Sequence, residues 1–117
     1  MNRKQKLIAA AALAAVAATW AIPAQAGRTL NAVKSRGMVV CGVNTAAPGF
    51  SGADSRGHWK GLDVDICRAV AAAVLKDANK VKFVPLSSEQ RFTALQSGQI
   101  DILARNTTWS MSRDASQ

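Results

Sequence analysis

Apolar residues recur along the chain with more than one spacing. The run Met38–Val43 is apolar on both faces, which suits a strand buried inside a parallel sheet. Ile66, Val70 and Val74 recur every four residues, with Cys67 and Ala71 beside them, and predict a helix with one apolar face. In order, we expect a helix over 29–36, a strand over 38–43, a long loop over 44–61, a helix over 62–76, a strand over 81–84, a helix that Ser87 or Ser88 caps and Gly98 ends, and a strand over 100–103.

This alternation of strands and helices predicts an α/β fold in which helices flank a parallel sheet, with right-handed crossovers. In open sheets of this kind, ligands bind beyond the carboxyl ends of the strands. Three segments leave those ends, over 44–50, 86–91 and 104–113, and all are rich in hydrogen-bonding groups. We therefore expect a binding site where the three segments meet.

The first 26 residues have the pattern of a cleavable export signal. Basic residues open it, an Ala-rich apolar run follows over 7–22, and Ala24-Gln25-Ala26 matches the A-x-A cleavage site. We expect residues 1–26 to be a signal peptide and residues 27–117 to form part of one small domain in the periplasm. An uncleaved membrane anchor is the alternative.

The chain is basic, with a formal net charge of +8, or about +5 without the three basic residues of the leader. The basic residues are scattered, and no aromatic residues are interleaved with them, so the charge argues only weakly for nucleic acid. A solvated surface that attracts anionic solutes or membranes is the simpler interpretation. We expect no nucleic-acid partner.

Two cysteines, Cys41 and Cys67, lie in the exported part. An even number in an oxidising compartment favours a disulfide. It would close a loop of about 26 residues and contribute roughly 3 kcal/mol. Two buried thiols that pack as small hydrophobic side chains are the alternative.

The sequence contains no recognisable catalytic or metal-binding motif. His58 is the single histidine and lies in the long loop between Gly57 and Trp59, where an exposed position is the ordinary interpretation. Asp63 and Asp65 are two positions apart on the predicted helix and do not face each other, so they suit partners of the helix dipole. We expect no catalytic residue, metal or cofactor.

A polar segment, Arg105-Asn106-Thr107-Thr108, follows the last predicted strand, and Arg113 comes five residues later. The arginine fork binds carboxylates bidentately, and hydroxyls and backbone amides at a helix start add further donors. Ser110 suits the N-cap of a helix with Arg113 at its third position. An ordinary capped helix with an exposed arginine is the alternative. Arg91 and Ser88 also have two interpretations. They are either an ordinary helix arginine and a helix cap, or part of the polar rim of the same cleft.

Longer motifs carry a family resemblance over Thr29–Gln117. They are Val39-Val40-Cys41-Gly42-Val43-Asn44, Pro48-Gly49-Phe50-Ser51, the stretch from Gly61 to Val70, the stretch from Arg91 to Leu103, and the stretch from Arg105 to Asp114. The chain resembles the periplasmic solute-binding proteins of polar amino-acid ABC transporters (solute-binding protein family 3), especially their general L-amino-acid-binding branch.

The resemblance implies a type II periplasmic-binding-protein-like fold, in which two hinged α/β lobes close on one L-amino acid. It also implies a monomeric, non-enzymatic protein that delivers its ligand to an ABC-transporter permease in the inner membrane. Arg113 would hold the α-carboxylate of the ligand, helped by Thr108 and by Asn106 or its backbone. The other implied contacts are Arg91 and Ser88 at the ligand's side chain or carboxylate, Asn44 lining the cleft, and Phe50 as an apolar wall.

The chain departs from the resemblance in length, since family members are about two to three times longer. It resembles a signal peptide followed by part of lobe 1, with the second lobe absent, and we expect such an N-terminal fragment to bind amino acids weakly. A dehydratase-like enzyme on the same fold and the sensor domain of a membrane receptor are alternatives. A basic module that binds anions or nucleic acid is a further one.

Overall fold

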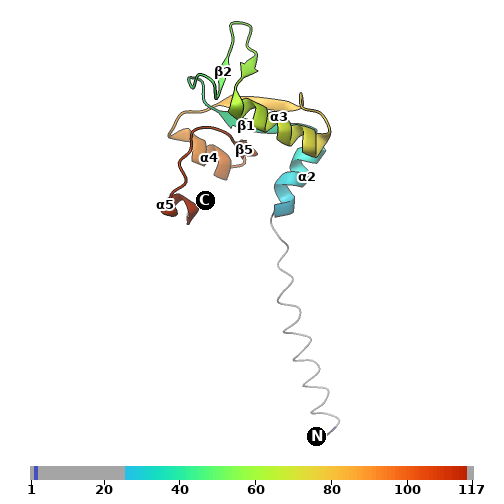
Figure 1. The fold of residues 1–117 in the computed structure, drawn as a ribbon. Helices are drawn as coiled ribbons and strands as arrows, with labels where there is room; N and C mark the ends of the chain where they lie inside the picture. Colours follow the sequence, from blue (N-terminus) through green and yellow to red (C-terminus); the bar gives the residue numbers. More distant parts are fainter. Residues whose placement is uncertain (1, 3–25, 116–117) are drawn as a thin grey trace.

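The structure is a computed structural model that describes Asn2 and residues 26–115. Its elements are α2 (Ala26–Arg36), β1 (Val39–Val43), β2 (Gly52–Ala53), β3 (Trp59–Lys60), α3 (Leu62–Leu75), β4 (Val81–Pro85), α4 (Gln90–Gln96), β5 (Ile102–Leu103) and α5 (Met111–Asp114) (Figure 1). Apart from Asn2 and Ala26, the predicted leader lies outside the described residues. Within the described part of the chain, no helix is long and apolar enough to cross a membrane.

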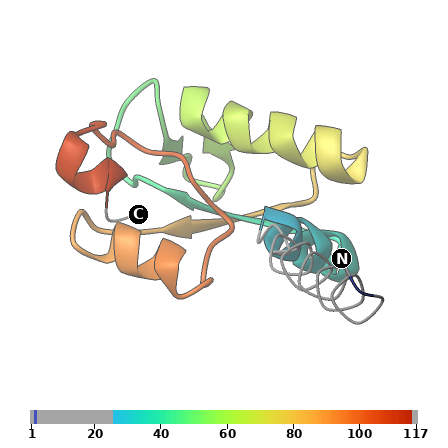
Figure 2. The ribbon, with the colours of Figure 1, turned by 90° about the horizontal axis from the view of Figure 1, so that it is seen from below.

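The main sheet has three parallel strands in the order β4-β1-β5. Cys41 of β1 lies opposite Phe83 of β4 on one side and Ile102 of β5 on the other. Helix α3 covers one face of the sheet and α4 the other (Figure 2). The predicted parallel α/β arrangement is confirmed, and β1, the most apolar strand, is the central one.

Helix α3 rests on the sheet through Val64, Cys67 and Ala71, which are all buried. Cys67 and Ala71 of the predicted apolar stripe are therefore buried as expected, whereas Ile66 is 47% exposed, although it was expected to face the core. The small residues Cys67 and Ala71 pack against β1, while the larger Ile66 at the edge of the stripe faces solvent. The helix ends at Lys76, which adopts a left-handed conformation with φ 59°.

A disulfide joins Cys41 of β1 to Cys67 of α3, as predicted. Both residues are fully buried, so the bond anchors the helix to the central strand inside the core. Trp59 closes the end of this cluster by packing on Phe83, with ring centroids 5.9 Å apart. This loop aromatic therefore closes over the small core.

The segment 44–61 contains more order than the predicted long loop. Strands β2 and β3 form an antiparallel hairpin, which rises from the sheet in Figure 1. Asp54 closes its turn by accepting hydrogen bonds from the backbone N–H groups of Arg56 and His58, both at 2.9 Å. These strands have two residues each, which is too short for a period-two hydrophobic pattern to reveal them.

A reciprocal capping interaction begins the α4 region, and it involves one of the two serines proposed from the sequence. The Ser87 hydroxyl accepts a hydrogen bond from the Gln90 backbone N–H at 3.2 Å, and the Ser87 N–H donates to the Gln90 side-chain oxygen at 3.3 Å. Pro85 ends β4 just before this cap, as its missing N–H requires.

Candidate ligand-binding site at the carboxyl edge of the sheet

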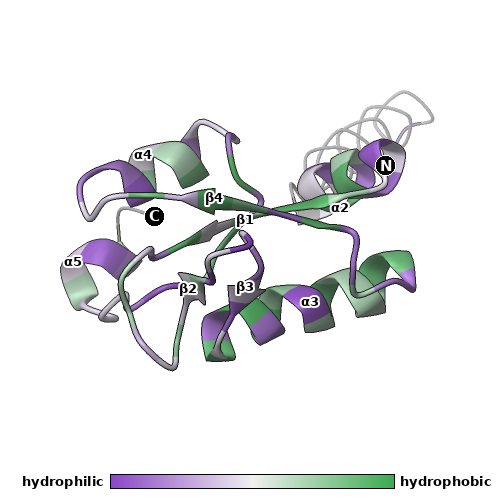
Figure 3. Cartoon of the chain, turned by 90° about the horizontal axis from the view of Figure 1, so that it is seen from above, coloured by the Kyte–Doolittle hydropathy of each residue, from purple (hydrophilic) through white to green (hydrophobic). Residues whose placement is uncertain are grey.

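Hydrogen bonds join the three segments that leave the carboxyl ends of β1, β4 and β5. The Asn44 side-chain amide after β1 donates to the Asn106 side-chain oxygen after β5, at 3.3 Å. Arg91 of α4, which follows β4, donates to the Asn106 backbone carbonyl at 3.1 Å. The expected convergence of these segments is therefore present, and Figure 3 shows α4 and α5 together at this end of the sheet.

Two arginines link the segment after β4 to the segment after β5, and they do so in opposite directions. Arg91 is 9% exposed and reaches forward to the Asn106 carbonyl and, at 3.5 Å, to the Thr107 hydroxyl. Arg105 reaches back to the Leu86 carbonyl and, at 3.5 Å, to the Ser88 hydroxyl. We call this pair of crossing links the arginine clasp of Arg91 and Arg105.

The charge of this edge is concentrated on three arginines. Burial lowers the pKa of the Arg91 guanidinium, and the positive charges of Arg105 and Arg113 lower it further, while Glu89 acts in the opposite direction. An arginine stays protonated despite such a shift, so Arg91 is a buried cation that the charges of Arg105 and Arg113 repel. The buried Nε atoms of Arg91 and Arg105 have no hydrogen-bond partner among the described residues.

Arg113 and Arg91 share one aromatic ring. Their guanidinium carbons lie 5.2 Å and 5.1 Å from the centroid of the Phe92 ring, within the range of cation–π attraction. Arg113 also donates to the Thr108 carbonyl at 2.7 Å. It occupies the third position of α5, after Ser110 at the N-cap, as the sequence predicted, although Ser110 makes no side-chain capping bond.

Asn44 and Phe50 lie on the β1 side of the same edge. The Asn44 side-chain oxygen accepts the Ala46 N–H at 3.2 Å, and its backbone carbonyl accepts the Ser51 hydroxyl at 2.7 Å, so its position is well held. Phe50 is 53% exposed, and its carbonyl accepts the Asp63 N–H at the start of α3. No described contact joins the Phe50 ring to the arginines.

Sequence reasoning missed Arg105 and Phe92 as members of this site. Arg105 is the second residue after β5, and that place at a carboxyl edge was the available signal. Phe92 had no signal of its own, because an apolar residue beside Arg91 on a helix reads as core. Trp109 is 84% exposed, and its ring nitrogen donates to Asp114 at 3.2 Å.

The chemistry of this edge suits binding rather than proton transfer. Glu89 is exposed, and a backbone hydrogen bond, the Ser87 side chain and the charges of Arg105 and Arg91 lower its pKa, so this carboxylate is ionised. His58 is outside the site, and its Nδ1 atom lies 3.6 Å from the Asp54 Oδ2 atom. Among the described residues, no group of three or more His, Cys, Asp or Glu side chains could hold a metal ion.

Comparison with known proteins identifies the family. Residues 39–116 match the model of the bacterial extracellular solute-binding proteins, family 3. The chain belongs to this family. The resemblance drawn from the sequence motifs is thereby confirmed.

Two curated relatives of the chain have names that state the amino acids that they bind. The chain is 55% identical over 111 residues to the general L-amino acid-binding periplasmic protein AapJ of Rhizobium johnstonii, covering 95% of this chain and 32% of AapJ. It is 49% identical over 112 residues to the glutamate/glutamine/aspartate/asparagine-binding protein BztA of Rhodobacter capsulatus, and the match covers 96% of this chain and 32% of BztA. The chain thus spans about a third of the length of these relatives.

A solved structure supports the same assignment for the fold. An ABC transporter periplasmic binding protein of Brucella ovis, with glutathione bound, aligns with a TM-score of 0.73 and 57% sequence identity. The alignment covers 75% of this chain and 27% of that protein. The fold is therefore that of the periplasmic binding proteins, and the chain contains part of one lobe.

Proposed function

We propose that this chain forms one wall of an L-amino-acid site in the periplasm, for delivery of the ligand to an ABC-transporter permease. The observation that carries the proposal is the gathering of arginines at the carboxyl edge of a parallel sheet, where Arg91 and Arg105 link the segments after β4 and β5 and Arg91 and Arg113 share the Phe92 ring. A free amino acid always has a carboxylate, and arginine binds that group with matched geometry. Family membership and the names of AapJ and BztA support the choice of amino acids.

In this proposal, Arg113 binds the α-carboxylate of the ligand. The Thr108 carbonyl and the Phe92 ring hold its guanidinium in place, which lowers the entropy lost on binding. Thr108 offers a hydroxyl, and the Asn106 backbone and amide lie next to the same edge. Asn44 supports Asn106 from the β1 side.

The remaining contacts surround the side chain of the ligand. Ser88 and Arg91 line one rim of the site, and Ser88 is held near Arg105. Phe50 supplies an apolar wall in this proposal, and its exposed ring leaves it free to meet a ligand or the opposite wall.

We propose that residues 27–117 correspond to the first part of lobe 1, after a signal peptide over 1–26. The additional length of the relatives would then supply the opposite wall. Closure of two walls excludes water from charged contacts and strengthens them. A single wall lacks this effect, so we expect millimolar rather than micromolar dissociation constants for the 117-residue chain acting alone as a monomer.

A binding role is preferred over an enzymatic one because the edge lacks a suitable acid or base. General acid–base catalysis needs a group whose pKa lies near the working pH. The lowered pKa of Glu89 takes that carboxylate away from such a range. The arginines stay protonated and do not serve as general acids or bases.

Ligand-observed NMR on the 117-residue chain tests the proposal with a panel of L-amino acids. We expect saturation transfer to L-amino acids, its loss in Arg113→Ala, and its retention in Arg56→Ala, which alters the distant β2–β3 turn. An unchanged response in Arg113→Ala removes that residue from the site. Absence of transfer to every amino acid contradicts the binding role of the chain. Micromolar affinity by calorimetry would contradict the need for a second wall.

A further inference from the structure

Four lysines gather at the amino end of the main sheet, opposite the candidate site. The chain has five lysines after its predicted leader, and Lys60 of β3 is the one paired with a carboxylate, that of Asp54 at 3.5 Å. The other four are exposed, and their side chains form no hydrogen bond or ion pair with a described residue. We call them the amino-end lysine cluster: Lys34 of α2, Lys76 and Lys80 in the connection from α3 to β4, and Lys82 of β4.

A group of packed apolar residues holds these lysines close together. It includes Val33 of α2, Leu75 of α3 and Val81 of β4. Each lysine of the amino-end cluster directly precedes or follows one of these three residues along the chain. The Lys80 carbonyl also accepts the Val39 N–H at 2.9 Å, which joins the α3–β4 connection to the start of β1. Figures 2 and 3 show α2 and the end of α3 at one end of the sheet, away from α4 and α5.

The carboxylates at this end do not cancel the charge of the lysines. Asp101 is already paired with Arg36. Asp77 is the other acidic residue of this end in the described part of the chain, and its side chain accepts the Asn79 N–H at 2.8 Å. Four lysines and one remaining aspartate therefore leave a net charge of +3 at the amino end of the sheet.

We infer that the amino-end lysine cluster is a docking surface for anionic lipid membranes. Lysine carries a compact, strongly hydrated charge on a flexible stem, which suits attraction to mobile phosphate headgroups rather than one fixed bidentate contact. The attraction of a basic surface to an anionic leaflet grows with each lysine near it and acts within a Debye length. Met38 is 39% exposed at the same end and offers one apolar side chain to the headgroup region.

Nucleic acid is the competing anionic partner, and the sequence around the lysines argues against it. Proteins that bind single strands add aromatic side chains on which the bases stack. The segments 26–39 and 76–82, which carry the four lysines, contain no aromatic residue. The predicted export signal also directs the chain to a compartment bounded by membranes. A lipid surface is therefore the partner that fits.

The lysine cluster and the candidate site occupy opposite ends of the same strands. Val39 begins β1 at the lysine end, and Asn44 follows the last residue of β1 at the site. Docking through the lysines leaves the carboxyl edge turned away from the lipid and open to a ligand. Lipid binding and amino-acid binding are consequently independent, so this inference goes beyond the proposed function and does not rest on it.

The experiment is co-sedimentation of the 117-residue chain with two kinds of vesicle. One kind is phosphatidylcholine alone, and in the other phosphatidylglycerol replaces about a third of that lipid. The ratio of the two partition coefficients measures the attraction to anionic lipid and removes any affinity for neutral lipid. We expect the anionic vesicles to be preferred about tenfold or more, and the preference to disappear when the salt concentration is raised to about 1 M.

Two matched double variants locate the attraction on the surface. Lys80→Gln with Lys82→Gln removes two charges of the cluster, and Arg56→Gln with Lys60→Gln removes two charges of the β2–β3 hairpin. We expect the first pair to lower the ratio about tenfold and the second to leave it nearly unchanged. Lys80→Arg with Lys82→Arg keeps both charges and should retain the ratio. The predicted leader is the same in every variant, so its own basic residues do not affect these comparisons, and thermal unfolding confirms that each variant is folded.

Equal losses in the two glutamine pairs, or no preference of the unmodified chain for anionic vesicles, overturn the docking surface. Tighter binding to a DNA duplex than to the anionic vesicles at the same salt concentration overturns the assignment to lipid. The NMR response to L-amino acids should be the same in the Lys80→Gln, Lys82→Gln variant as in the unmodified chain. Its loss there would contradict the independence of the two surfaces, whereas its absence from the unmodified chain contradicts the proposed function alone.

Discussion

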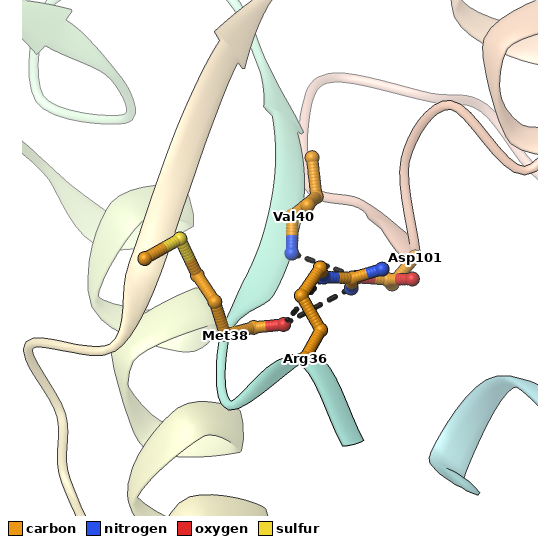
Figure 4. A network of polar contacts seen from close by, with 4 residues as sticks. All are labelled: Arg36, Met38, Val40 and Asp101. Atoms are coloured by element: carbon orange, nitrogen blue, oxygen red, sulfur yellow. Dashed lines mark hydrogen bonds and ion pairs between the residues drawn. The ribbon is translucent and has the colours of Figure 1, made fainter. Parts of the chain in front are cut away.

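Arg36 at the end of α2 forms an ion pair with Asp101, which precedes β5 (Figure 4). The same Asp101 oxygen accepts the Val40 backbone N–H of β1 at 2.8 Å, and the Asp101 N–H donates to the Val40 carbonyl at 2.8 Å. Arg36 also donates to the Met38 carbonyl through two nitrogens, at 3.1 Å and 3.0 Å. One carboxylate therefore fastens α2 and β1 to the start of β5 at the end of the sheet opposite the candidate site.

Asp101→Ala should destabilise the fold by about 1–3 kcal/mol, because it leaves the Val40 N–H and the Arg36 guanidinium without their acceptor. Asp101→Asn is the matched control, since its amide oxygen can still accept from Val40, and we expect a smaller loss. Urea unfolding followed by circular dichroism measures both. Equal losses would contradict the role of the backbone bond.

Gly61→Ala should destabilise the start of α3 much more than Gly37→Ala does. Both glycines have positive φ, 122° and 69°, but a side chain at Gly61 would collide with the Phe50 carbonyl and lie 2.9 Å from the Ser51 nitrogen. At Gly37 a methyl group meets open space, so only the backbone strain of about 1–2 kcal/mol applies. The midpoints of urea unfolding compare the two. A similar cost for both would show that the 50–51 backbone moves away freely.

The stability contributed by Asp54 should disappear in acid. The His58 backbone N–H is the largest cause that lowers the pKa of Asp54. Burial opposes it by a smaller amount, and the Arg56 N–H lowers the pKa further. Because folding lowers this pKa, the ionised carboxylate stabilises the fold at pH values above the ordinary pKa of an aspartate. That contribution is lost as the pH falls through the lower folded value, below about pH 4.

Comparison of the unmodified chain with Asp54→Asn tests this linkage. We expect the unmodified chain to have the larger free energy of unfolding at pH 7 and the two to converge near pH 2. A difference that persists at pH 2 would mean that the charge of Asp54 is not what stabilises the turn.

Phe92→Leu should weaken amino-acid binding while keeping the fold. The substitution removes the ring beneath Arg91 and Arg113, and each cation–π contact is worth about 0.5–2 kcal/mol. Phe83→Leu is the matched control, because Phe83 faces Arg68 at 5.7 Å and Trp59 in the core, away from the site. It should lower thermal stability without changing the NMR response to amino acids. A response that Phe92→Leu leaves intact would contradict the positioning role of the ring.

The sequence predicted the features that local spacing controls. The order of helices and strands, the Ser87 cap, the N-cap place of Ser110 and the third helical place of Arg113 all depend on residues within four positions of each other. The Cys41–Cys67 bridge was also predictable, because two cysteines in a chain with a predicted export signal have one possible pairing. The polar segments after the strands were recognised because parallel strands bring their carboxyl ends to one edge.

The tertiary structure decided what depends on distant residues. It placed β1 between β4 and β5, turned Ile66 outward and buried Val64, and built a hairpin inside the 44–61 segment. It also joined Arg91 to Asn106 and Arg105 to Ser88 across 15 and 17 positions. Hydrophobic spacing reports which side of an element avoids water, but not which neighbour covers it. That choice belongs to long-range packing, and it is what brings the arginines of this chain together.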